Sequence, residues 1–152
     1  MSALLAWIEA TTPARSVAAS VSVTAWLSAF HLIGFTILMG SALVAGLRAV
    51  GALLNRASLD DVVRPAHRMI SLGLAMSVTT GGLLFAARAT EIAENGTFRL
   101  KMLLLVAAVG FQILALGPKG RAQRQRARAA GAIALALWLA LTLTACAFIL
   151  LE

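Results

Sequence analysis

The sequence predicts an all-α integral membrane protein, a four-helix bundle with both termini on the periplasmic side. Only 12% of the 152 residues are charged, whereas a soluble domain carries about 25%. The mean hydropathy is +0.91. Four apolar stretches of near-spanning length lie in one domain, roughly residues 24–47, 69–87, 102–118 and 129–151. Because the bilayer interior offers no water to backbone groups, each stretch is expected to be a helix.

Residues 1–15 precede the apolar stretches. This start, MSALLAWIEATTPAR, has no positive charge before its apolar part, and Glu9 interrupts that part, so we do not expect a cleaved signal. Its apolar residues, among them Leu4 and Trp7, would cover one side of a short helix lying on the membrane surface. We expect either such an interfacial helix or a frayed terminus.

The first stretch holds one ionisable side chain, His31. From Ser16 to Leu47 there is no Asp, Glu, Lys or Arg, and about 20 apolar residues suffice to cross a bilayer. An ionisable group inside a span is costly to keep there, so it is a functional-site hypothesis. Trp26 is expected to be an interfacial anchor, and Trp138, well inside the fourth stretch, a packing residue.

The connections between stretches carry turn and capping signals. Ser58 and Asp61 have the spacing of a capping box, which predicts that the second helix begins near Leu59 and bends at Pro65. The dipeptide at residues 95–96, Asn-Gly, predicts a turn before the third stretch.

The basic residues predict the orientation. Nine lie on the side of the first and third connections and four on the other, which favours the first side as cytoplasmic. The nine are Arg48, Arg56, Arg64, Arg68, Lys119, Arg121, Arg124, Arg126 and Arg128, and the four are Arg15, Arg88, Arg99 and Lys101. We therefore expect a multi-pass protein of the bacterial cytoplasmic (inner) membrane.

Small residues predict where helices approach one another. Gly73, Ser77 and Gly81 recur every four positions on one face of the second stretch, and Gly40 and Gly46 act similarly in the first. Plain bundle packing explains most of these positions.

The same small residues favour a cofactor beside His31. This histidine lies about seven residues inside its span, or roughly 10 Å at about 1.5 Å per residue. At equal depth the other stretches carry only small side chains, which leaves room for a flat haem b held by the imidazole. These residues are Gly81, Gly82, Ala107, Ala108, Thr144 and Ala145.

Three basic residues are expected near the proposed haem. Lys101 opens the third stretch on the side of His31, either as a boundary lysine that snorkels to the interface or as a partner for a haem propionate. Arg99 and Arg88 would assist in holding a carboxylate. Met102 and Met76 are the candidates for the second axial position.

Two further sets of ligands can be considered: both histidines around one haem, or a histidine with sulfur ligands around copper. His67 lies roughly 25 Å along the helix from His31, so one haem cannot join them, and we expect it in an interfacial basic segment. His31, Met102 and the single cysteine, Cys146, would together suit copper.

Most of the chain from Trp26 on carries a family resemblance. The segments AWLSAFHLIGF and FRLKMLLLVAAVGFQ, followed by an arginine-rich connection, resemble an uncharacterised family of small four-span bacterial inner-membrane proteins. That family in turn resembles the copper resistance D proteins and the haem-containing membrane protoporphyrinogen oxidases. The resemblance implies that His31 and Lys101 are the functional pair. In the oxidases the third span has a histidine near the position where this chain has Gln112. This departure bears on the oxidase activity more than on haem binding.

The expected function is therefore that of a haem b-binding electron-transfer protein or membrane redox subunit, with His31 as the axial ligand. The alternatives are a copper-handling protein of the copper resistance D type and a non-catalytic subunit that anchors a partner complex. Expected partners are membrane lipid, a redox partner or larger complex, and a second copy of the chain, but not nucleic acid. No nucleophile–base pair, phosphate loop or paired carboxylates lie in the stretches, which argues against a hydrolase or an ATP-driven pump.

Overall fold

The computed structural model describes residues 2–117 and 124–151, and this part of the chain is all-helical. Its seven helices are α1 (Ser2–Glu9), α2 (Thr12–Ala19), α3 (Val21–Val50), α4 (Leu59–Ala87), α5 (Ala89–Glu94), α6 (Gly96–Ala115) and α7 (Arg124–Leu151). Four of them, α3, α4, α6 and α7, are long and apolar enough to cross a membrane, which confirms the prediction of four spanning helices.

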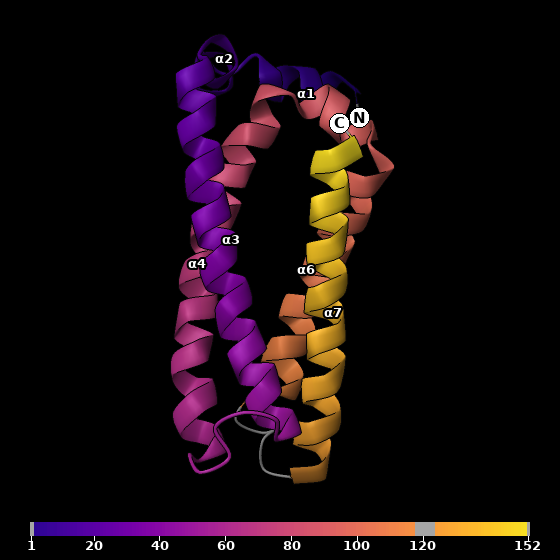
Figure 1. The fold of residues 1–152 in the computed structure, drawn as a ribbon. Coiled ribbons are helices and arrows are strands. Elements are labelled where there is room, and N and C mark those ends of the chain that lie inside the picture. The colour runs from indigo at the N-terminus through magenta and orange to yellow at the C-terminus, as the bar shows by residue number, and fades with distance from the viewer. Residues whose placement is uncertain (1, 118–123, 152) are drawn as a thin grey trace.

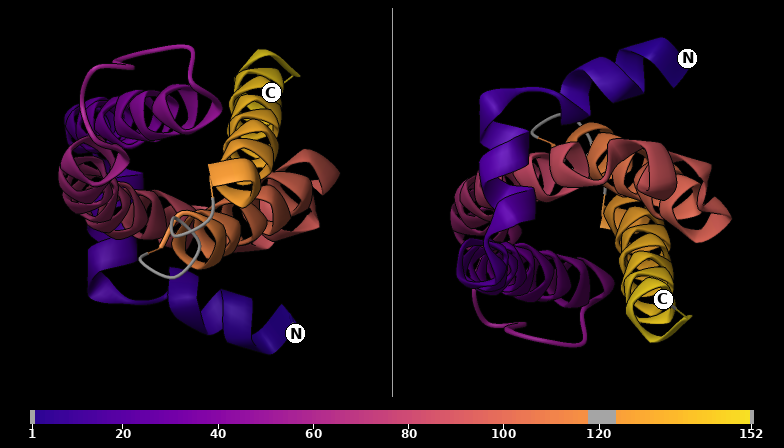
Figure 2. Two further views of the ribbon diagram at one scale, coloured as in Figure 1. Left: turned by 90° about the horizontal axis from the view of Figure 1, so that it is seen from below. Right: turned by 90° about the horizontal axis from the view of Figure 1, so that it is seen from above.

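The spanning helices form two antiparallel pairs, α3 with α4 and α6 with α7 (Figure 1). Helix α3 also packs on α7, and the two pairs separate toward the end that carries α1, α2 and α5. We call this the upper end, and the end with the connection of residues 51–58 the lower end. Viewed along the bundle, the four helices form an open arc rather than a closed square (Figure 2). Helix α1 and the last residues of α7 both lie at the upper end (Figure 1), on opposite sides of the bundle (Figure 2).

The helix starts follow from their caps. The Ser58 hydroxyl accepts a hydrogen bond from the backbone nitrogen of Asp61 at 3.1 Å, which confirms the predicted start of α4. The side chain of Asn95 accepts from the nitrogens of Thr97 and Phe98, so α6 begins at Gly96. Asn95 therefore caps a helix where the sequence predicted a turn, since asparagine serves both roles.

The helices extend past the apolar stretches. Helix α6 starts six residues before the predicted stretch at 102, and α7 starts at Arg124 rather than at 129. Charged residues mark where the apolar part of a sequence ends, but a helix continues into the polar layer until a cap or a breaker stops it.

The row of small residues on α4 faces α3, and it allows the close approach of helices that the sequence predicted without naming the partner helix. A Cβ atom added at Gly73 would lie 2.6 Å from the Gly34 carbonyl oxygen and 2.6 Å from the Leu38 nitrogen, so these backbones touch. One added at Gly46 would meet the side chain of Leu135 on α7 at 2.7 Å. The expectation for Gly40 was wrong, because no atom lies within 4 Å of such a position.

The hydrophobic core is confined to the middle and lower parts of the bundle. All buried residues of α3 lie between Gly34 and Ala49, and none of residues 21–33 is buried. The buried residues of α4 likewise end at Ser77. Trp138 of α7 is fully buried, which confirms that it is a packing residue.

Candidate functional site

The candidate site is centred on the imidazole of His31, which is half-buried on α3 against α4. Its Nδ1 lies 2.9 Å from the carbonyl oxygen of Ser77 and 3.3 Å from the hydroxyl of Thr80. A carbonyl oxygen can only accept a hydrogen bond, so the proton of the neutral ring sits on Nδ1 and is donated to Ser77. In this tautomer the lone pair of the ring lies on Nε2.

No atom of the described residues is hydrogen-bonded to His31 Nε2. The ring is thus held from one side, and its basic nitrogen is left without a protein partner in that part of the chain. Histidines that bind a metal through one nitrogen usually donate the other N–H to a carbonyl or carboxylate, which fixes the tautomer and the ring orientation. The bond to Ser77 provides this arrangement.

Gly81 allows the ring to lie against α4. A Cβ atom at this position would stand 2.8 Å from His31 Cε1 and 3.0 Å from Nδ1, so any side chain there would displace the imidazole. At Gly82, one residue further on, an added Cβ atom would have no atom within 4 Å. The sequence grouped both glycines as the small layer near His31; in the structure Gly81 contacts the ring itself, whereas Gly82 is exposed.

Lys101 is the other residue of the pair that the sequence singled out. It is half-buried on α6, and its positive charge acts on the imidazole of His31. The two residues that the sequence paired therefore come together from different helices. Because α6 begins at Gly96, Lys101 lies in the second turn of the helix rather than at its first residue. Ala108, which the sequence placed at the depth of His31, is fully buried in the hydrophobic core.

The arginines near the site bind elsewhere. The Nε of Arg99 donates to the carbonyl of Ala93 at 2.8 Å, which ties this exposed side chain to the end of α5. Arg88 forms an ion pair with Glu91, in which Nε donates to Oε2 at 3.0 Å.

The bundle opens at the level of His31. On α3 the face that meets α7 carries Met39, which is 8% exposed and lies 3.5 Å from the hydroxyl of Thr142. Leu32 lies seven residues earlier on the same face and is 53% exposed. The side of α3 that packs on α7 in the lower half is therefore uncovered in the upper half, where the ribbons also diverge (Figure 1).

A second polar cluster lies in the lower half and joins three helices. Gln112 of α6 is 1% exposed; its Nε2 lies 3.3 Å from Nε2 of His67 on α4, and its Oε1 accepts from Nε1 of Trp138 at 3.2 Å. The indole can only donate, so the amide oxygen must face it and the amide nitrogen must face His67. His67 then accepts at Nε2 and is neutral.

The sequence did not predict this cluster. We expected His67 in an interfacial segment, but it is half-buried and bonded to one of the most buried side chains of the bundle. Depth gave no signal, because His67, Gln112 and Trp138 lie eight, three and fourteen residues from the lower ends of α4, α6 and α7. Only the relative rotation of the helices decides whether such residues meet, and the sequence does not give that rotation.

The soft ligands of the copper alternative are exposed side chains. Cys146 is exposed on α7, and Met102 is 41% exposed on α6. Residues 2–117 and 124–151 contain no group of three or more His, Cys, Asp or Glu side chains arranged to hold a metal ion. A cofactor at this site would rest on a single imidazole from this chain.

Comparisons with known proteins give a family but no activity. No curated protein and no solved structure matches the chain. One family model matches residues 5–145, which include all four spanning helices up to the last turns of α7 as well as both histidine clusters. The chain therefore belongs to the family of unknown function DUF6644.

Proposed function

We propose that this protein is a haem b-binding membrane protein that transfers electrons or serves as a redox subunit, with Nε2 of His31 as an axial ligand. The observation that carries the proposal is the hydrogen bond from His31 Nδ1 to the Ser77 carbonyl, 2.9 Å long. It fixes the ring with Nε2 as the basic nitrogen, and an imidazole of that kind is the usual proximal ligand of a b-type haem.

The surroundings of His31 fit a flat, anionic cofactor. Gly81 lets the imidazole lie against α4, and Leu32, which is 53% exposed, marks a part of α3 that the other described helices leave largely uncovered. Lys101 would hold a haem propionate, since its charge already reaches the imidazole. When bound, the haem supplies one-electron chemistry; this chain holds the iron ligand, excludes water by its apolar helices and balances the carboxylate charge.

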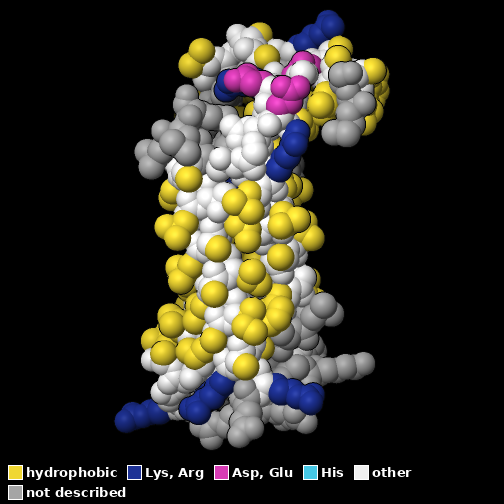
Figure 3. Space-filling view, turned by 90° about the vertical axis from the view of Figure 1, so that its right-hand side faces the viewer, with side chains coloured by type: hydrophobic (Ala, Val, Ile, Leu, Met, Phe, Trp, Pro, Cys, Tyr) yellow, Lys and Arg dark blue, Asp and Glu magenta, His cyan; other side chains and the backbone are white. Residues whose placement is uncertain are grey.

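We extend the proposal to the membrane in which the protein works. The lower end carries Arg48, Arg56, Arg64 and Arg68, whereas Glu9, Glu91 and Glu94 lie near the upper end. Figure 3 shows the corresponding separation of acidic side chains from the basic lower end on one face. Since basic residues are retained in the cytoplasm, the upper end with His31 would face the periplasm of a bacterial inner membrane.

The test is a visible absorption spectrum, oxidised and reduced, of protein purified from cells supplied with a haem precursor. We expect a Soret band that is lost in His31→Ala and retained in the matched variant His67→Ala. Gly81→Ala should weaken haem binding because the new methyl group displaces the ring, whereas Gly82→Ala should leave it unchanged.

Three outcomes would overturn the proposal. A colourless protein that folds with full helical content has no haem, and metal analysis that finds copper without porphyrin would assign it to metal handling. A Soret band that survives His31→Ala would remove His31 as the essential ligand.

A further inference from the structure

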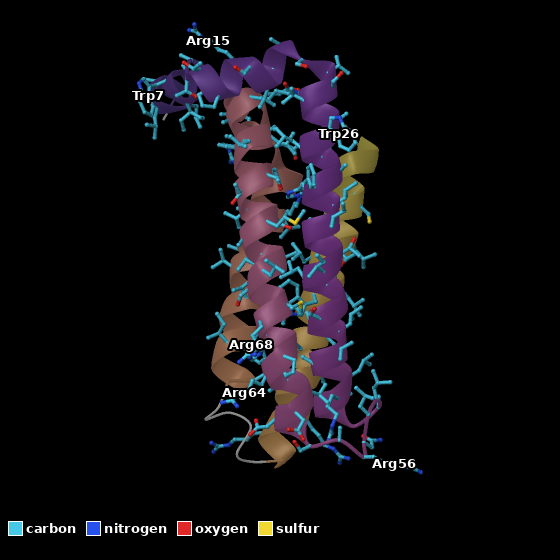
Figure 4. All side chains as sticks on the ribbon, turned by 90° about the vertical axis from the view of Figure 1, so that its left-hand side faces the viewer. Trp7, Arg15, Trp26, Arg56, Arg64 and Arg68 are labelled. Atoms are coloured by element: carbon cyan, nitrogen blue, oxygen red, sulfur yellow. The ribbon has the colours of Figure 1, made fainter. Side chains whose placement is uncertain are left out.

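Helix α1 projects sideways from the upper end of the bundle. It lies across the direction of the spanning helices (Figures 1 and 4). Helix α2 fixes it there, because Ala14 is fully buried and Val17 is 5% exposed where α2 packs on α4. The angle of α1 is therefore set by a packed contact.

A partly buried hydrogen bond also holds the C-terminal end of α1. Oε1 of Glu9 accepts from the backbone nitrogen of Thr90 at 2.7 Å, which joins α1 to the start of α5. The only charged side chain of α1 is thus turned toward the protein. On the rest of the helix Leu4 and Trp7 are 61% and 67% exposed.

The direction of these side chains indicates what covers them. Figure 4 shows Trp7 of α1 beside the upper end of the bundle, and Arg15 of α2 farther from the spans than either Trp7 or Trp26. Tryptophan is enriched at the level of the lipid headgroups, and arginine beyond it lies in water. Trp7 and Trp26 come from different helices and occupy the same end of the bundle.

We infer that α1 is a membrane-surface anchor, with Leu4 and Trp7 inserted at the boundary between headgroups and acyl chains. The occupant is lipid rather than a protein, because one helix of eight residues is far smaller than the roughly 800 Å² per partner of a stable protein interface. Helix α1 has no basic residue, so its insertion rests on apolar burial and needs no anionic lipid.

The experiment places nitroxide labels on the full-length protein in phosphatidylcholine nanodiscs, in a Cys146→Ser background. The labelled positions are Leu4→Cys on α1, Arg15→Cys as the water-facing control and Val106→Cys as the lipid-facing control, since Val106 is 70% exposed on a spanning helix. Collision rates are measured with oxygen, which partitions into lipid, and with a soluble nickel chelate.

We expect the ratio of oxygen to nickel collisions at Leu4 to exceed that at Arg15 several-fold and to approach that at Val106. Adding anionic phosphatidylglycerol should not change it. A ratio at Leu4 equal to that at Arg15 would overturn the inference, as would lipid exposure that requires the anionic lipid.

A second measurement needs no change in α1. In the Trp26→Phe protein, brominated lipid should quench Trp7, while Trp138 stays unquenched because it is fully buried. The Trp7→Phe, Trp26→Phe double variant gives the signal of Trp138 alone. If bromination quenches both proteins equally, Trp7 is not in contact with lipid and the anchor is disproved.

Discussion

The two histidines of this protein occupy contrasting environments at opposite ends of the bundle. His31 donates through Nδ1 to a backbone carbonyl of α4, and no described residue bonds its Nε2. Nε2 of His67 instead faces the amide of Gln112, which is fixed in turn by Trp138. The ring of His31 is fixed through one nitrogen, and its other nitrogen is able to bind a ligand. The ring of His67 links its helix to two others.

The difference extends to packing. The lower half contains the buried core and the close backbone contacts, whereas residues 21–33 of α3 are all at least partly exposed. A bundle built in this way derives its stability from one half and leaves the other half free to accommodate a ligand. Three substitutions test whether stability is divided in this way.

The largest loss is expected from Trp138→Ala in the core. Removing a fully buried Trp leaves a cavity and an unpaired Gln112 oxygen, at a cost of about 3–5 kcal/mol. Unfolding in mixed micelles with increasing SDS measures the change. The control Leu143→Ala, at a residue 71% exposed on the same helix, should change stability little. Equal losses of unfolding free energy in the two variants would contradict the placement of Trp138 in the core.

A smaller loss is expected from Gly73→Ala, at the crossing of α3 and α4. The added methyl group meets the backbone of Gly34 and Leu38, which cannot move aside as a side chain can, so the cost should be about 1–3 kcal/mol. Gly40→Ala is the matched control. It has open space and gains helix propensity, so it should be neutral or stabilising by up to about 1 kcal/mol. If both variants behave alike, the two helices do not touch at Gly73.

The smallest loss is expected from Gln112→Leu. The substitution removes two hydrogen bonds, each worth roughly 0.6 kcal/mol and at most about 1.7 kcal/mol within a membrane bundle. The same SDS titration measures it, with Ile113→Ala at an exposed neighbour as the control. The haem spectrum should not change, because the cluster lies away from His31. A lost spectrum with unchanged stability would reverse the roles assigned to the two halves.

Much of the fold could be predicted from the sequence. The four spans follow from runs without charge, the start of α4 from Ser58, and a close helix contact along α4 from small residues that recur every four positions. These features depend on local sequence and on one helix face. The short helix α5 was missed, because the six residues Ala89–Glu94 lie in a polar connection where periodicity gives little signal.

The candidate site was predicted in part. His31 stood out as the only ionisable group in its span, and Lys101 as a cation at the same end. The charge of Lys101 acts on the His31 ring, and their role as a functional pair stays a prediction. The contact of His31 with Gly81 and the chain from His67 to Trp138 could not be foreseen. Each depends on how far one helix is turned about its axis, and apolar residues on all sides of a membrane helix give no amphipathic face from which to determine that rotation.

The contact between Gly34 and Gly73 has a consequence for how the protein is made. Both glycines belong to consecutive helices joined only by residues 51–58, so their contact does not depend on any later part of the chain. During synthesis α3 and α4 can therefore dock as a hairpin while the ribosome is still translating α6. Helices α6 and α7 then assemble against a surface that already exists, with the His31 ring seated in place on Gly81.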